Sequence, residues 1–156
     1  ANLPGVSLCL VGDGPTRGAL EQLLPRANFL GYRSGLPLAH AYAALDVFVH
    51  TGTKETFGQT LQEAMAAGLP VVAPAAGGPL DIVKPGVTGL LFDPEQPGSL
   101  RQAVGGLVAD PAMRARMGAS GRGKVETRSW KTLTAELLEF YGSVINPAWA
   151  PGIRVA

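Results

Sequence analysis

The chain has 156 residues, of which 46% are hydrophobic and 16% are charged, and its formal net charge is +1. This length is enough for one domain with a sizeable core, and the near-neutral charge argues against a general nucleic-acid binder, which would carry a marked basic excess. The single cysteine, Cys9, excludes an intrachain disulfide.

Short apolar, β-branched segments alternate with helical patterns along most of the chain. The predicted strands cover residues 6–11, 27–30, 47–49, 71–73 and 90–92. The predicted helices cover residues 17–24, 36–44, 59–67, 79–83, 99–108, 112–124 and 130–144. This alternation predicts an α/β fold, namely a Rossmann-like parallel sheet with helices on both faces. Residues 1–145 are expected to form this domain, and residues 146–156 a loose tail.

The segment between the predicted strands 47–49 and 71–73 is the most informative part of the chain. A polar loop leaves the first strand, and from Gln59 onward apolar side chains recur with a helical period. Gly68 ends this helix, and Pro70 prevents its continuation. The unit is therefore a βαβ crossover, whose loop lies at the carboxyl edge of the sheet, where open α/β proteins bind ligands.

The start of this helix combines features that suit a phosphate group. Its unpaired amide N–H groups and the positive end of the helix dipole, of roughly half a charge, attract anions. These amides belong to Phe57, Gly58, Gln59 and Thr60. Because Gly58 has no Cβ, a ligand can approach the backbone there.

Two carboxylates flank the helix start. Glu63 lies about one turn into the helix and can accept hydrogen bonds from both hydroxyls of a ribose, each worth roughly 1.5–3 kcal/mol. Glu55 lies in the loop itself, nearer the reacting end of a ligand. The alternative interpretation is that both are solvated surface glutamates.

The spacing Glu55-x7-Glu63, with Phe57-Gly58 after the first glutamate, resembles the donor-binding signature of the retaining GT-B glycosyltransferases of the GT4 family. Further segments resemble, in order and spacing, the rest of that family's carboxyl-terminal domain; they cover residues 11–15, 29–32, 46–49, 77–81 and 86–91. Together the resemblance spans residues 3–145. The residues from His50 to Thr60 are similar to the GDP-mannose-dependent α-mannosyltransferases of the family.

The resemblance implies the donor-binding half of a hexosyltransferase, which moves mannose from GDP-mannose to an acceptor hydroxyl with retention at the anomeric carbon. Glu55 would be the catalytic residue that orients the sugar, without acting as a nucleophile. The family's first strand and helix carry an arginine and a lysine that clamp the diphosphate, and these elements are expected to be missing here. The chain alone is therefore expected to be inactive, and its implied partners are the nucleotide-sugar donor and an amino-terminal acceptor domain.

Further donor-binding residues are also implied by the resemblance. They are Gly12, Gly31, Tyr32, Arg33 and His50. The turn at Gly12 would line the nucleotide side of the cleft, the backbone of residues 31–33 would contact the base, and His50 would line the sugar pocket. The alternatives are structural: Gly12 would belong to a strand-to-helix turn, Arg33 would be an exposed surface arginine, and His50 would be a histidine with its hydrogen bonds satisfied within the fold. Gly77-Gly78 could allow close backbone approach to the donor.

The last predicted helix carries four large side chains, Trp130, Leu137, Phe140 and Tyr141. In the resembling family this helix crosses onto the partner domain, so these side chains could pack there. The alternative is that they complete the core of this domain.

Several other functions find little support in the sequence. A dehydrogenase is disfavoured because Arg17 stands where the third glycine of the dinucleotide fingerprint should be, and no P-loop motif is present. Two separated histidines and one cysteine form no metal-ligand cluster, so no metal or other cofactor is expected beyond the GDP- or UDP-linked donor. A UDP-glucose-type donor and a non-catalytic nucleotide-sugar-binding module stay open as alternatives.

The sequence also gives an expectation for location. No apolar run approaches the roughly 18–20 residues that a spanning helix needs, and no signal peptide is evident. We therefore expect a cytoplasmic protein, with peripheral contact at the inner membrane face made through the acceptor domain.

Overall fold

The structure, a computed structural model, describes residues 3–145. Its strands are β1 (Cys9–Val11), β2 (Asn28–Gly31), β3 (Phe48–Val49), β4 (Val71–Pro74) and β5 (Gly89–Phe92). Its helices are α1 (Arg17–Leu23), α2 (Gly35–Ala43), α3 (Gln59–Ala66), α4 (Pro79–Ile82), α5 (Ser99–Ala109), α6 (Pro111–Glu126) and α7 (Trp130–Ile145). Each predicted element is present, although β1 begins later than predicted. The predicted loose tail, residues 146–156, lies outside the described residues.

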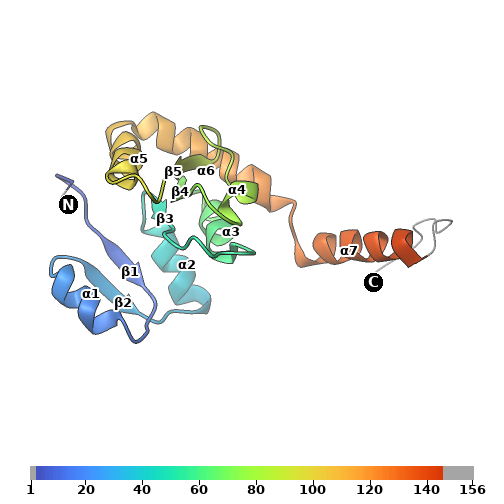
Figure 1. The fold of residues 1–156 in the computed structure, drawn as a ribbon, viewed down its shortest axis with the longest axis horizontal. Coiled ribbons are helices and arrows are strands. Elements are labelled where there is room, and N and C mark those ends of the chain that lie inside the picture. Colours follow the sequence, from blue (N-terminus) through green and yellow to red (C-terminus); the bar gives the residue numbers. More distant parts are fainter. Residues whose placement is uncertain (1–2, 146–156) are drawn as a thin grey trace.

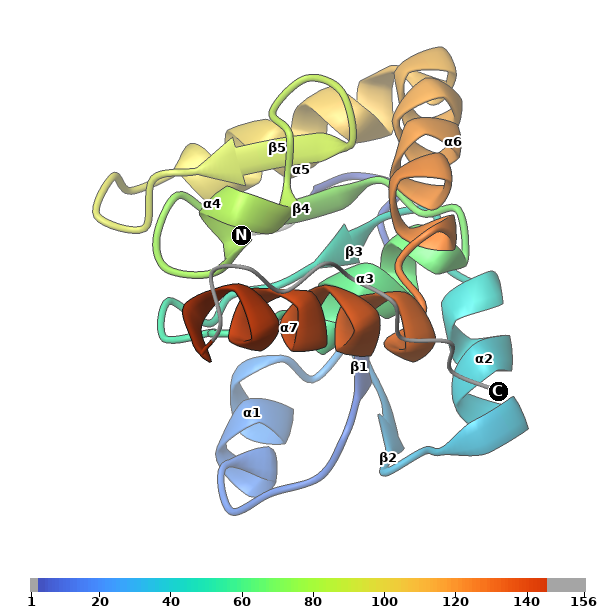
Figure 2. The same cartoon turned by 90° about the vertical axis from the view of Figure 1, so that its right-hand side faces the viewer.

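All strand pairs among the described residues are parallel, as predicted, but they form two sheets rather than one. The first sheet contains β1 and β2, and the second has the order β3-β4-β5. In both Figure 1 and Figure 2, β1 lies on the side of its sheet that faces β3. No described strand lies between β1 and β3 and pairs with both, so the strands form two separate sheets.

The second sheet is covered by helices on both faces, and β4 lies at its centre. Every residue of β4 is buried, as is typical of a central parallel strand. Alternate side chains point to opposite faces: Val71 and Ala73 pack with α3, whereas Val72 packs with Leu107 of α5 and Met117 of α6. The predicted α/β fold with helices on both faces is therefore confirmed for this sheet.

Close contact between α6 and the end of α3 fixes the helix that supports the site. Gly118 of α6 lies against the backbone of Gly68, so closely that a Cβ would overlap the Gly68 carbonyl oxygen. At Gly121 a Cβ would lie 3.2 Å from Cγ of Met65. Further along α6, Lys124 donates through Nζ to the backbone oxygen of Ile82 at 2.7 Å. These contacts tie α3, α4 and α6 together.

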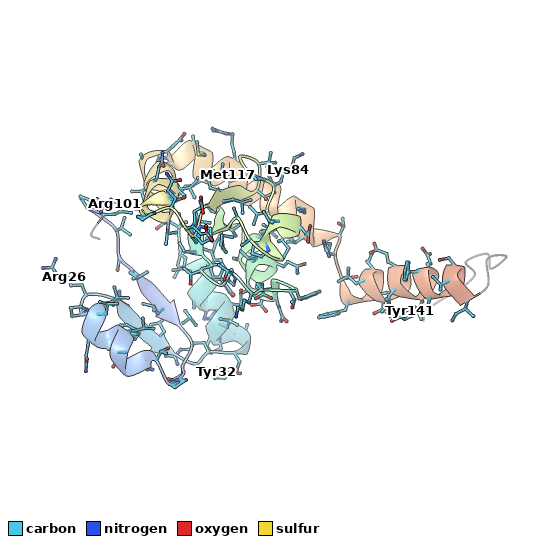
Figure 3. The ribbon with its side chains drawn as sticks, in the orientation of Figure 1. Arg26, Tyr32, Lys84, Arg101, Met117 and Tyr141 are labelled. Atoms are coloured by element: carbon cyan, nitrogen blue, oxygen red, sulfur yellow. The ribbon has the colours of Figure 1, made fainter. Side chains whose placement is uncertain are left out.

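Among the described residues, two groups of exposed apolar side chains concern the edges of this domain. One is the segment containing β1, where Val6, Leu8 and Val11 are between 38% and 45% exposed. The other is α7, which contains no buried residue and projects from the rest of the molecule (Figure 1). Tyr141, labelled on this helix in Figure 3, lies far from Met117, which is inside the body.

Candidate donor-binding site

The site begins in the loop between β3 and α3. The backbone N–H of His50 donates to the oxygen of Val72 at 2.8 Å and so keeps the start of the loop on the sheet. At the other end of the loop, Gly58 adopts a left-handed conformation with a φ of 63° directly before α3. This backbone conformation favours glycine, and a Cβ at this position would also require the end of the Ile82 side chain to move.

Glu55 organises this loop through a single oxygen. Its Oε1 accepts hydrogen bonds from the backbone N–H groups of Thr56 at 2.9 Å, Phe57 at 3.1 Å and Gly58 at 2.9 Å. The bond from Gly58, with smaller contributions from Phe57 and Thr56, keeps the pKa of Glu55 below its ordinary value although partial desolvation opposes this shift. The nearby charge of His50 acts in the same direction. Glu55 is therefore an ionised carboxylate that closes the turn before α3.

The amides predicted to bind phosphate fall into two pairs. Those of Phe57 and Gly58 donate to Glu55. Those of Gln59 and Thr60 occupy the first positions of α3, where a helix provides no backbone partner, and no described side chain caps them. An anion that approached α3 would therefore meet these two amides, while Glu55 stays beside it.

Glu63 is held from two directions. The hydroxyl of Tyr42, on α2, donates to Oε2 of Glu63 at 3.0 Å, and Nε2 of Gln59 donates to Oε1 at 3.0 Å. Burial, followed by the bond to Glu63, raises the pKa of Tyr42 above its ordinary value. The phenol therefore stays protonated and donates a hydrogen bond to the carboxylate. Glu63 is the fifth residue of α3, and its carboxylate reaches back along the helix to the side chain of Gln59.

Tyr42 was not among the predicted site residues. It lies on the apolar face of α2 with Leu38, and its ring packs against Phe48 with a centroid distance of 5.7 Å. One signal in the sequence could have found it: the hydroxyl of a tyrosine in a core position needs a polar partner. The identity of that partner, 21 residues away in the chain, becomes visible only in the structure.

Gly77-Gly78 contacts the Glu55 loop directly. The Gly78 N–H donates to the backbone oxygen of Glu55 at 2.9 Å. A Cβ on Gly78 would lie 2.8 Å from the backbone oxygens of both Glu55 and Thr56. These glycines therefore let the loop approach α4, and close approach of the donor to Gly77-Gly78 stays a prediction.

The residues predicted for the nucleotide side lie on the first sheet, at the carboxyl ends of β1 and β2. The Gly12 N–H donates to the oxygen of Gly31 at 2.9 Å, which joins the two turns. Beyond them, Tyr32 is 72% exposed, and Arg33 donates through Nη1 to the oxygen of Tyr32 at 2.9 Å. The structure thus brings Gly12, Gly31, Tyr32 and Arg33 together as one group, separate from the group around α3.

His50 lies at the end of β3, and its environment is unusual. Its Nε2 is buried and has no hydrogen-bond partner among the described residues. A Cβ on Gly52 would lie 3.1 Å from this atom, so the turn that follows closes over the imidazole. The predicted structural alternative, a histidine with its hydrogen bonds satisfied, is therefore wrong for Nε2.

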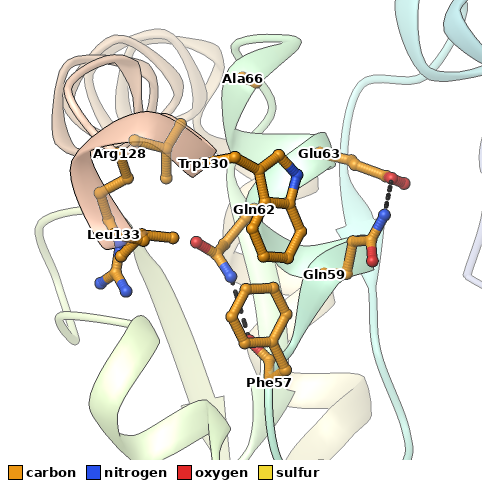
Figure 4. Close-up of a pocket in the computed structure, with 9 residues that line it drawn as sticks. Phe57, Gln59, Gln62, Glu63, Ala66, Arg128, Trp130 and Leu133 are labelled. Atoms are coloured by element: carbon orange, nitrogen blue, oxygen red, sulfur yellow. Dashed lines mark hydrogen bonds between the residues drawn. The ribbon is translucent and has the colours of Figure 1, made fainter. Parts of the chain in front are cut away.

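A shallow pocket of about 240 Å³ opens beside Glu63, between α3 and the start of α7 (Figure 4). One wall is a stacked pair of rings, Phe57 and Trp130, with centroids 5.6 Å apart and planes inclined by 12°. The remaining walls are Gln59, Gln62, Glu63, Ala66, Val125, Arg128 and Leu133. Trp130 thus contacts this domain, while Leu137, Phe140 and Tyr141 stay between 48% and 63% exposed and do not complete its core.

Solved structures with a similar fold are glycosyltransferases of the two-domain type. Anabaena Alr3699/HepE in complex with UDP superposes with a TM-score of 0.79 at 30% identity, over 90% of this chain and 42% of that protein. Sucrose-phosphate synthase from Thermosynechococcus elongatus gives a TM-score of 0.78 at 32% identity, over 90% of this chain and 39% of the other. The fold therefore defines the chain as a GT-B glycosyltransferase domain.

The chain belongs to the family of glycosyl transferases group 1, whose model matches residues 1–124. It is 48% identical over 142 residues to the GDP-mannose-dependent alpha-mannosyltransferase of Mycolicibacterium smegmatis, and 40% identical over 140 residues to that of Corynebacterium glutamicum. These matches cover 90% of this chain but only 37% and 34% of those relatives. The predicted family resemblance is thus confirmed, and the chain spans about a third of the length of these relatives.

Between residues 3 and 145, no three His, Cys, Asp or Glu side chains are grouped so that they could hold a metal ion. In the same range no helix combines the length and hydrophobicity needed to cross a bilayer. Metal-independent transfer, cytoplasmic location and peripheral membrane contact stay predictions.

Proposed function

We propose that this chain is the donor-binding half of a retaining hexosyltransferase that transfers mannose from GDP-mannose to an acceptor hydroxyl. The observation that carries the proposal is Glu63, a carboxylate oriented by Tyr42 and Gln59 on the same helix whose first amides, those of Gln59 and Thr60, are not capped by a described side chain. A carboxylate suits a ribose diol, and helix amides suit a diphosphate, so a nucleoside diphosphate matches both parts of the site. The names of the similar mannosyltransferases support GDP-mannose as the donor.

In this proposal the amides of α3 act on the leaving group. The diphosphate gains negative charge as the glycosidic bond breaks, and oriented N–H groups stabilise that charge because they need no reorganisation. Gln59 and Thr60 provide such groups in addition to the dipole of α3. Arginine and lysine side chains from outside this chain would complete the diphosphate site.

Glu55 has two separate tasks in the proposal. Its Oε1 binds the turn before α3, and its Oε2 accepts no hydrogen bond from a described residue. We assign Oε2 to the hydroxyls of the transferred hexose, which it would orient without forming a covalent bond. His50, which precedes this loop, is kept as a lining residue of the sugar pocket, and contact through its buried Nε2 would require the turn at Gly52 to move.

The nucleotide base is assigned to the first sheet. Backbone groups of residues 31–33 and the turn at Gly12 would contact it, and the exposed ring of Tyr32 or the guanidinium of Arg33 could stack on it. Because these contacts are largely to the backbone, they discriminate weakly between guanine and uracil. A UDP-glucose donor is the second candidate, and it is favoured by the similarity to Alr3699/HepE, solved in complex with UDP-glucose at 31% identity.

The proposal also assigns partners to the two exposed apolar regions. We propose that a further parallel strand, from outside this chain, pairs with β1 and β3 and covers Val6 and Leu8. The exposed side chains of α7, including Leu137 and Phe140, would pack against the acceptor domain. In this arrangement the chain alone binds donor weakly and transfers no sugar.

Calorimetric titration with GDP, UDP, GDP-mannose and UDP-glucose tests the proposal. We expect all four to bind the chain and a full-length protein that contains it, with GDP and GDP-mannose only modestly tighter than their uridine counterparts because the base contacts discriminate weakly. Glu63→Gln should weaken binding of every nucleotide, whereas Glu55→Gln should mainly lower the rate of sugar transfer by the full-length protein. A full-length protein that binds the nucleotides but transfers no hexose would favour the non-catalytic module, and absence of binding would refute the donor site.

A further inference from the structure

We infer that Tyr42 is a positioning residue for Glu63, and that the Tyr42–Glu63 bond sets the preference of the site for ribonucleotides over 2′-deoxyribonucleotides. The inference rests on the proposed function, in which Glu63 binds the ribose. It adds Tyr42, on α2, to the site, and it predicts a selectivity that the spacing of Glu55 and Glu63 alone does not predict.

The geometry fixes the hydroxyl of Tyr42 more firmly than a surface contact would. Tyr42 is the buried residue of α2, with 9% of its surface exposed, and its ring packs against Phe48. Its hydroxyl lies 3.0 Å from Oε2 of Glu63 and 3.5 Å from the backbone oxygen of Thr60. The hydroxyl is therefore anchored by the core on one side and directed at α3 on the other.

Both oxygens of Glu63 have a donor, but neither is saturated. Tyr42 donates to Oε2 and Gln59 donates to Oε1, each at 3.0 Å. A carboxylate oxygen offers about two acceptor directions, so each keeps one for a ligand. Two acceptor directions on one fixed carboxylate suit two adjacent hydroxyl groups, which is the arrangement of the 2′- and 3′-hydroxyls of a ribose.

The order imposed on Glu63 accounts for the expected selectivity. A free glutamate side chain loses rotamer freedom when it binds a diol, whereas one held by Tyr42 and Gln59 has already lost it. A 2′-deoxyribose would leave one acceptor of the fixed carboxylate unsatisfied, and the carboxylate cannot turn to compensate. Without the Tyr42 hydroxyl, Glu63 could reorient toward a single hydroxyl and the selectivity would shrink.

The test compares GDP with 2′-deoxy-GDP, using the full-length protein that contains this chain. We expect the unmodified protein to bind GDP at least about tenfold more tightly, since the lost bond involves a charged group. Tyr42→Phe keeps the ring and removes only the hydroxyl; it should weaken GDP binding by about tenfold and reduce the ratio of the two affinities to about two. In transfer assays KM for the donor should rise more than kcat falls.

Three further variants make the outcome decisive. Tyr141→Phe removes the same hydroxyl from the exposed helix α7 and should change neither affinity. Gln59→Leu removes the donor to Oε1 from an exposed position and should also lower the ratio, which keeps the inference testable if Tyr42→Phe fails to fold. Glu63→Gln should abolish the preference.

The possible failures can be told apart. If Glu63→Gln abolishes the preference while Tyr42→Phe and Gln59→Leu keep the ratio of the unmodified protein, the inference about Tyr42 is overturned and the ribose assignment stands. If Glu63→Gln changes neither affinity, the ribose assignment of the proposed function fails, and the inference fails with it.

Discussion

Gly78→Ala tests whether the loop that carries Glu55 is positioned by its contact with the start of α4. The backbone at Gly78 has φ −54° and ψ −32°, which alanine adopts readily, so only packing opposes the change. A Cβ would lie 2.8 Å from the backbone oxygens of Glu55 and Thr56. Since a relaxed contact of carbon with oxygen needs about 3.3 Å or more, the loop must move by roughly half an ångström.

The expected cost follows from two opposing effects. Replacing glycine by alanine stabilises the folded state by about 0.4–1 kcal/mol, because the unfolded chain loses conformational freedom. Forcing a methyl group into a packed backbone contact costs about 1–3 kcal/mol. We therefore expect a net loss of about 1 kcal/mol in the free energy of unfolding, measured by urea denaturation with Gly123→Ala as the control, because a Cβ at Gly123 meets no atom within 4 Å.

The functional effect of Gly78→Ala should exceed its effect on stability. Misplacement of a reacting group by about 1 Å can reduce a rate by about a hundredfold, so half that displacement of Glu55 should lower kcat of the full-length protein by about tenfold. Nucleotide affinity should change less, since Glu63 lies on α3 and not on the displaced loop. A Gly78→Ala protein as active as the unmodified protein, and no less stable, would refute the assignment of this contact.

Three further predictions concern packing, pH and metals. Gly118→Ala should destabilise the fold by about 1–3 kcal/mol in urea denaturation, because α6 must separate from Gly68, whereas Gly123→Ala in the same helix should stabilise it slightly; equal effects would contradict the packing described here. The lowered pKa of Glu55 means that its contribution to loop order is complete above the unfolded value of 4.5 and is lost as the pH falls through the lower folded value. The loss of order should appear as faster amide hydrogen exchange at Phe57 and Gly58 in acid, and Glu55→Gln should abolish this acid-induced change. If the pH profile of exchange is the same in the variant, the three-amide contact is contradicted. Sugar transfer by the full-length protein should persist in excess EDTA, and a loss that added magnesium or manganese restores would disprove the predicted metal independence.

The order and type of the helices and strands could be predicted because they depend on local signals. The four residues of β4 form a continuous apolar run, and Gly68 and Pro70 end α3 where the sequence predicts. The division into two sheets could not be predicted, since strand pairing is decided by segments far apart in the chain. The expected single sheet would require a strand between β1 and β3 that the described residues do not supply.

The candidate site shows the same limit at the scale of side chains. The spacing of Glu55 and Glu63 predicts that both lie near the start of α3, and the structure places them there. The spacing does not predict that Glu55 turns back onto the amides of its own loop, because that depends on a side-chain rotamer. Nor does it predict Tyr42, whose contact with Glu63 depends on how α2 packs against α3.

The carboxylate of Glu55, bound to three successive amides, has a consequence for how the loop behaves before any ligand arrives. Successive backbone N–H groups that converge in a turn form a concentration of positive partial charge, and here the protein supplies the compensating anion from its own chain. The turn is consequently shaped in the ligand-free state, and a substrate that enters does not have to order it. If the proposed donor binds here, its affinity is not diminished by the entropy of ordering this loop.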